Sequence, residues 1–102
     1  MRPVLVTDIL GLARVLTGVS FVERLELAQR LIDDTENADR YRRATGTSHP
    51  LLGDGSLLTR CLLTKPPPEP GPDDVEFLGA IAVAALVLSL KLRSGGDRMA
   101  LV

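Results

Sequence analysis

Several side chains that support familiar protein chemistry are scarce in this chain of 102 residues. There is one Cys, Cys61, which excludes an intrachain disulfide and any cysteine-rich zinc module. There is one His, His49, which excludes a multi-histidine metal site within one chain. Trp is absent, and the formal net charge of -1 provides no overall attraction to nucleic acid or to an anionic membrane. We therefore expect a protein that is not an enzyme and that uses no metal ion and no cofactor.

Apolar side chains are abundant by contrast, and in the first half of the chain they recur at intervals typical of one face of an α-helix. The first such set is Leu5, Ile9, Leu12 and Leu16. It predicts a helix over residues 7–17, with Thr7 or Asp8 as its cap and Gly18 after its end.

A second set of apolar residues with the same spacing is Phe21, Leu25, Ala28 and Ile32. It predicts a longer helix that begins at Ser20 and ends at Gly46. Ser20 and Glu23 have the spacing of a capping box. In such a box the Ser hydroxyl bonds the amide of residue 23, and the Glu carboxylate returns to the amide of Ser20.

The second half of the chain predicts a short helix, a connector and a final helix. Asp54 or Ser56 is suited to cap a short helix over residues 57–64. Five of the eight residues in 65–72 are Pro, so we expect an extended connector there. Three carboxylates at the start of residues 73–92 suit the first turn of a helix.

Together these segments predict an all-α fold, a small helical bundle of three long helices and one short helix with a Pro-rich connector. No segment alternates between polar and apolar residues as a strand would. Residues 1–92 are expected to form a single domain, and residues 93–102 a flexible tail.

The final predicted helix is unusually apolar. Residues 77–90 carry no charge, but a helix that spans a membrane needs about 20 such residues. Asp8 and Arg14 interrupt the N-terminal apolar stretch, so no signal peptide is expected and the chain is predicted to be cytoplasmic. Because the final helix carries apolar residues on all its faces, we expect it to be the central helix of the bundle or to bury a face against a second chain.

The polar segment between residues 39 and 57 is the predicted partner-binding surface. Its candidate residues are Arg40, Tyr41, Arg42, Arg43, His49, Asp54 and Ser56. The arginines are suited to a phosphate or carboxylate, but helix ion pairs from Glu36 to Arg40 and from Asp39 to Arg43 would neutralise much of that charge.

The glycines beside Asp54 allow two interpretations. They could present amides to an anion, or they could form a tight turn in which Asp54 caps the next helix. If this loop folds beside the second helix, Asp54 could also meet an arginine and hold the loop in place.

A hydrolase built on His49 with Cys61 or Ser56 is the least favoured interpretation. Cys61 lies among leucines and is expected to be a small residue of the core. Contact with DNA is also disfavoured, because the short helix carries only Arg60 as a cation.

The run DRYRRATGTSHPLLGDGSL, residues 39–57, resembles a segment shared by small uncharacterised proteins of alphaproteobacteria. These proteins carry a DRYRxxTGxxHPxxGDGSL core followed by a Pro-rich stretch and an apolar helix, which would cover residues 20–92 of this chain. The family is a domain of unknown function, so the resemblance implies no activity, cofactor or catalytic residue. It implies a bacterial, cytoplasmic setting and directs attention to residues 39–57.

The sequence leaves the function unknown. We interpret the chain as a small non-enzymatic interaction or adaptor protein that binds a protein partner or forms a homodimer. A small-molecule ligand is neither indicated nor excluded. Two alternatives stay open: a small regulator that contacts nucleic acid or the transcription machinery, and peripheral membrane association through the apolar helix 75–92.

Overall fold

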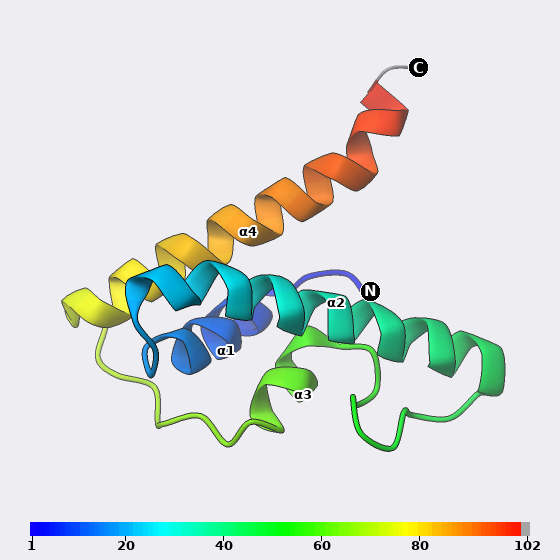
Figure 1. The fold of residues 1–102 in the computed structure, drawn as a ribbon, viewed down its shortest axis with the longest axis horizontal. Coiled ribbons are helices and arrows are strands. Elements are labelled where there is room, and N and C mark those ends of the chain that lie inside the picture. The colour runs from blue at the N-terminus through cyan, green and yellow to red at the C-terminus, as the bar shows by residue number, and fades with distance from the viewer. Residues whose placement is uncertain (101–102) are drawn as a thin grey trace.

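Four helices follow one another in the computed structural model, which describes the backbone of residues 1–100 and the side chains of residues 1–94. They are α1 (Val6–Leu16), α2 (Phe21–Thr45), α3 (Leu57–Leu62) and α4 (Val75–Ala100). Figure 1 shows α4 crossing α2 and continuing beyond the other helices. No strand occurs in the described backbone, where a single isolated bridge joins His49 and Gly53. The predicted all-α fold of three long helices and one short helix is confirmed.

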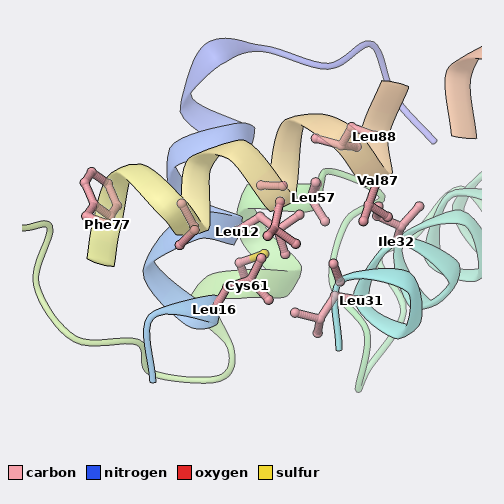
Figure 2. Packing of buried hydrophobic residues seen from close by; sticks show 14 residues of the cluster. Leu12, Leu16, Leu31, Ile32, Leu57, Cys61, Phe77, Val87 and Leu88 are labelled. Carbon is pink, nitrogen blue, oxygen red and sulfur yellow. The ribbon is translucent and has the colours of Figure 1, made fainter. Parts of the chain in front are cut away.

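The hydrophobic core lies where α1, α3 and the first half of α4 meet α2. Figure 2 shows it as one cluster with Leu57 and Cys61 of α3 near its centre. Its buried members are Leu12, Ala13, Leu16, Ala28, Leu31, Ile32, Leu57, Cys61, Phe77, Ala80, Val83, Ala84, Val87 and Leu88. Cys61 is fully buried, so the prediction that it belongs to the core is confirmed.

The predicted cap of α1 is wrong, although the extent of the helix is within one residue of the prediction. Leu5 is the N-cap residue, and the Asp8 carboxylate accepts a hydrogen bond from the Leu5 amide at 2.7 Å. Asp8 therefore serves the helix start from the first turn, where a negative charge is favoured. Leu12 and Leu16 are buried as expected, whereas Leu5 is 64% exposed because it precedes the first turn that packs on the core.

The predicted buried face of α2 is also wrong in its first two turns. Phe21 and Leu25 are 68% and 45% exposed, whereas Arg24 is only 5% exposed. Arg24 faces α4 instead, where its guanidinium lies 2.9 Å from the Glu76 carboxylate and also donates to the carbonyl of Val19. The Arg24 side of α2 thus lies toward α4, and Phe21 is left in solvent.

The bounds of α2 are predicted well, but the capping box is not formed. Ser20 is the N-cap residue, yet its side chain makes no capping hydrogen bond, and the Glu23 amide bonds the Ser20 carbonyl instead. Ser20 is exposed, so water can satisfy the remaining amides. At the other end Gly46 has a φ of 77°, the left-handed conformation that glycine adopts readily at a helix end.

The connector after α3 is extended, as its prolines predict. No helix occurs between Leu62 and Val75, and the Arg14 guanidinium of α1 donates to the carbonyl of Pro67 at 2.9 Å. This bond holds the connector against α1. The connector thereby leads the chain to the start of α4.

α4 is longer than predicted and is not the central helix of the bundle. It continues beyond residue 92 to Ala100. Residues 101–102 of the predicted tail lie outside the described residues, and the division at residue 92 stays a prediction. α1 and α2 cover only one face of α4, because Phe77, Ala84 and Leu88 are buried while the opposite face is exposed. The segment Val75–Ser94 is long and apolar enough to cross a membrane by length and composition alone, as core helices of soluble proteins also are, and 33% of it is buried.

Candidate functional site

The predicted partner-binding residues lie at one end of the molecule, on the last turns of α2 and on the loop that returns to α3 (Figure 1). The loop reverses direction between His49 and Gly53, whose amides each donate to the other's carbonyl at 2.9 and 3.3 Å. This turn brings the two parts of the predicted surface together.

The side chain of His49 stabilises this turn. Its Nδ1 atom accepts hydrogen bonds from the amides of Leu51 and Leu52, both at 3.0 Å. A neutral imidazole that accepts at Nδ1 carries its proton on Nε2. The ring also meets the ring of Tyr41 edge to face, with centroids 4.9 Å apart. Tyr41 and His49 are thus two predicted site residues that the fold brings into contact.

The glycine-rich stretch forms the predicted tight turn, but Ser56 and not Asp54 caps α3. Asp54 Oδ1 accepts from the Ser56 amide at 2.9 Å and from the Ser56 hydroxyl at 2.8 Å. Ser56 is the N-cap of α3, and its hydroxyl oxygen accepts from the Thr59 amide. Burial alone would raise the pKa of Asp54, but the bonds from Ser56 and the charge of Arg2 outweigh it and hold this pKa below 3.8. A carboxylate held ionised at this place repels an anion, so the loop is not suited to bind one.

The three arginines have different partners. The predicted pair from Asp39 to Arg43 is present, whereas the pair from Glu36 to Arg40 is not. Glu36 instead lies 3.1 Å from the Lys91 ammonium, because α4 passes beside this turn of α2. Arg40 donates to the side chain of Asn37, and both residues are exposed.

Arg42 connects α2 to the loop. Its guanidinium lies 3.5 Å from the carbonyl oxygen of Asp54, a long hydrogen bond. The Asp54 carboxylate meets a different arginine, with Oδ2 3.8 Å from Arg2 Nη1. The Asp54 carboxylate therefore faces Arg2 at the N-terminus and not an arginine of α2 as expected, while Arg42 of α2 reaches only the backbone of the loop.

Asp39 is a buried anchor beneath this surface. Its carboxylate lies 3.2 Å from the amino group of Met1 and also binds the Arg43 guanidinium. Burial by itself would raise the pKa of Asp39. The hydrogen bonds and positive charges of the Met1 amino group and Arg43 outweigh burial, so the pKa is lowered and the group stays ionised. A Cβ at Gly55 would lie 3.0 Å from the Cα of Asp39, so the loop packs tightly here.

Other polar contacts of the fold could not be read from sequence spacing. Asp8 Oδ1 accepts from the Leu58 amide at 2.9 Å, which ties α1 to the start of α3. The Arg60 guanidinium donates two bonds to Asp34 Oδ2, at 3.1 and 3.0 Å. These partners are 50 and 26 residues apart in the chain, so no local pattern marks them.

The described side chains offer little for catalysis. Burial raises the pKa of the Cys61 thiol to about 12, so it stays protonated and is a poor nucleophile. The Nδ1 atom of His49 is already occupied by two amides. Among residues 1–94, no three His, Cys, Asp or Glu side chains lie where they could hold a metal ion.

What remains exposed at this end is a cationic and aromatic group of side chains, Arg40, Tyr41, Arg42 and Arg43, which as consecutive residues are spread around the last turns of α2, with His49 beside Tyr41. We call it the arginine surface. Arg43 is 70% exposed and Tyr41 is 37% exposed. Guanidinium groups in this setting are suited to the planar carboxylates of another molecule.

Comparison with known proteins gives a family without an assigned role. No curated protein and no solved structure matches the chain. One family model, described as a domain of unknown function (DUF7742), matches residues 2–89. Because this match spans most of the chain, the protein belongs to the family of the domain of unknown function DUF7742.

Proposed function

We propose that the chain is a small non-enzymatic interaction protein that binds an acidic segment of a protein partner through the arginine surface. The observation that supports this most directly is the exposed set of guanidinium groups beside Tyr41 and His49. Exposed carboxylates of a partner can form charge-assisted, two-pronged hydrogen bonds with arginines. Tyr41 adds an apolar and polar contact in one side chain, a combination that is enriched at protein interfaces.

The frame of this surface is built from within the chain. Asp54 and Ser56 were predicted to touch the partner, but their polar atoms bond each other and the start of α3. We therefore assign them the role of positioning the loop. A surface whose shape is already held by internal bonds loses less conformational freedom when a partner binds.

Contact with nucleic acid is less well supported than contact with a protein. Arg60 is the cation of α3, and it is bound to Asp34 by two hydrogen bonds. The remaining positive charge is balanced across the chain, whose net charge is -1. A gel-shift series at several salt concentrations separates the two interpretations, because phosphate contacts weaken steeply with salt.

The test is affinity capture from the native cell with the full chain and two double variants. Arg40→Ala with Arg42→Ala removes guanidinium groups from the arginine surface. Arg30→Ala with Lys65→Ala removes the same number of charges at exposed positions elsewhere, and it is the matched control. We expect the first pair to abolish capture of a protein that the wild type and the control retain.

The captured protein is then purified and titrated with each variant. A loss of affinity of at least ten-fold for the arginine-surface variant is expected, with an unchanged unfolding transition for that variant. If Arg42→Ala and Asp54→Ala leave both partner binding and stability unchanged, the proposal is wrong.

A further inference from the structure

The outer face of α4 carries a row of exposed residues separated alternately by three and four positions. The row is Val75, Leu78, Ala82, Ala85, Ser89 and Leu92. Val75, Leu78 and Leu92 are 80%, 48% and 54% exposed. Leu86 and Leu90 lie beside the row and are 51% and 53% exposed. Such a contiguous apolar strip is uncommon on a monomer that has no partner.

The spacing of the row is that of a coiled-coil seam, in which residues repeat every 3.5 positions along the helix. The middle of the seam consists of small residues, Ala82, Ala85 and Ser89, which let a second helix approach closely. Large residues occupy both ends. Reversing the row puts Ala82 opposite Ala85 and Val75 opposite Leu92, and it puts the large Leu78 opposite the small Ser89, so that the two copies are complementary in size. A symmetric dimer requires this self-complementarity, because each copy presents the same patch.

Charges at the two ends of the row favour the same antiparallel arrangement. Asp73 lies just before its beginning and Arg93 at its end, and both are exposed, whereas Glu76 and Lys91 are already paired with Arg24 and Glu36 of α2. In an antiparallel pair Asp73 of one copy lies near Arg93 of the other. In a parallel pair like charges would meet, which costs free energy and selects against that arrangement.

We propose that two copies of this chain associate through the outer faces of α4, packed antiparallel. A second copy of this chain accounts for both the seam and the charges. A lipid surface accounts only for the apolar side chains. Helices that lie in a membrane interface carry cations beside the apolar face, whereas the start of α4 carries carboxylates that an anionic membrane repels. The arginine surface lies on other residues, so the two proposals can fail independently.

The first test is sedimentation of the full chain over a concentration range from about 1 to about 300 μM, within which interfaces of moderate affinity are populated. The expected species is a dimer of twice the chain mass of 11.0 kDa. Leu78→Glu and Leu86→Glu place carboxylates in or beside the seam and are expected to weaken the dimer at least ten-fold. Circular dichroism establishes that each variant is still helical. Arg30→Glu, on the exposed side of α2, is the matched control and leaves the dimer intact.

The second test addresses the direction of packing by exchanging charges. Asp73→Lys alone and Arg93→Glu alone each bring like charges together in the antiparallel dimer, so each weakens it. The double variant restores opposite charges and is expected to restore dimerisation.

Three outcomes would overturn the proposal. One is a monomer at every concentration, and another is a dimer that Leu78→Glu and Leu86→Glu leave unchanged. The third is a monomer that floats with vesicles of phosphatidylcholine and phosphatidylglycerol and loses that binding in Leu86→Glu. Failure of the double variant to restore the dimer would refute the antiparallel direction.

Discussion

Replacing Asp8 tests how one buried carboxylate supports the starts of two helices. Its Oδ2 atom accepts from the Leu5 amide at 2.7 Å, and its Oδ1 atom accepts from the Leu58 amide at 2.9 Å. The residue is only 5% exposed, so water cannot easily replace it as an acceptor. A hydrogen bond to a charged group contributes about 1.5–3 kcal/mol. Asp8→Ala removes both bonds and should lower the free energy of unfolding by about 3–6 kcal/mol.

Asp8→Asn is the sharper variant, because it changes charge and hydrogen bonding with almost no change of shape. The Asn side chain keeps one acceptor oxygen and turns an NH2 group toward an amide that donates. We expect a loss of about 2–4 kcal/mol, a large part of the roughly 5–15 kcal/mol that stabilises such a domain. For a chain of this size that loss corresponds to a fall in Tm of about 10–25 °C.

The measurement is urea unfolding followed by circular dichroism at 222 nm, with Asp73→Asn as control. Asp73 is exposed on the turn before α4, so its replacement should change stability by less than about 0.5 kcal/mol. If Asp8→Asn and Asp73→Asn have the same midpoint, then the amides of Leu5 and Leu58 do not depend on Asp8 and the reasoning is wrong.

Three further predictions concern the loop and the core. Gly55 has a φ of 95° and lies against Asp39, whereas Gly46 has a φ of 77° in open space. Gly55→Ala should therefore cost at least about 1 kcal/mol more in urea unfolding than Gly46→Ala, and equal costs would contradict the tight packing. The thiol of Cys61, with its pKa of about 12, should react with a disulfide reagent only as fast as the chain unfolds. Rapid labelling under native conditions would show that the core around it is open. The pKa values of Asp39 and Asp54 lie below 3.8 in the fold, so their stabilisation is present above pH 3.8 and lost as the pH falls below it. Asp39→Asn and Asp54→Asn should each flatten the acid part of a plot of unfolding free energy against pH, and an unchanged slope would refute this account.

The bounds of α2 and the start of α3 could be predicted because their signals are local. Ser20 and Gly46 bracket α2, and Ser56 caps α3, within one turn of the helix each one serves. The face that α2 buries could not be predicted in the same way. It depends on how α2 meets α4, where the contact between Arg24 and Glu76 joins residues 52 positions apart. The apolar spacing that begins at Phe21 therefore indicated the wrong side of the first turns.

In the candidate site, too, contacts between neighbouring residues could be predicted and contacts between distant residues could not. The turn formed by Asp54 and Ser56 and the pair from Asp39 to Arg43 span at most four residues, and both were predicted. The contact between Tyr41 and His49 was not predicted, because it depends on how far the loop folds back. The sequence left open whether the apolar helix would be central in the bundle or bury a face against a second chain, and the packing of α1 and α2 shows which face of α4 stays exposed.

The N-terminal segment couples the stability of the fold to the shape of the arginine surface. The Arg2 amide bonds the Gly55 carbonyl at 3.3 Å, and the Arg2 guanidinium lies 3.8 Å from Asp54. Asp8 then holds the start of α3, immediately after the same loop. A substitution in this set loosens the loop that carries His49, so reduced partner binding in such a variant can reflect loss of shape. Arg40 is exposed and bonds the side chain of Asn37 on its own helix, so its replacement separates binding from folding, whereas Arg42 also bonds the loop at the Asp54 carbonyl.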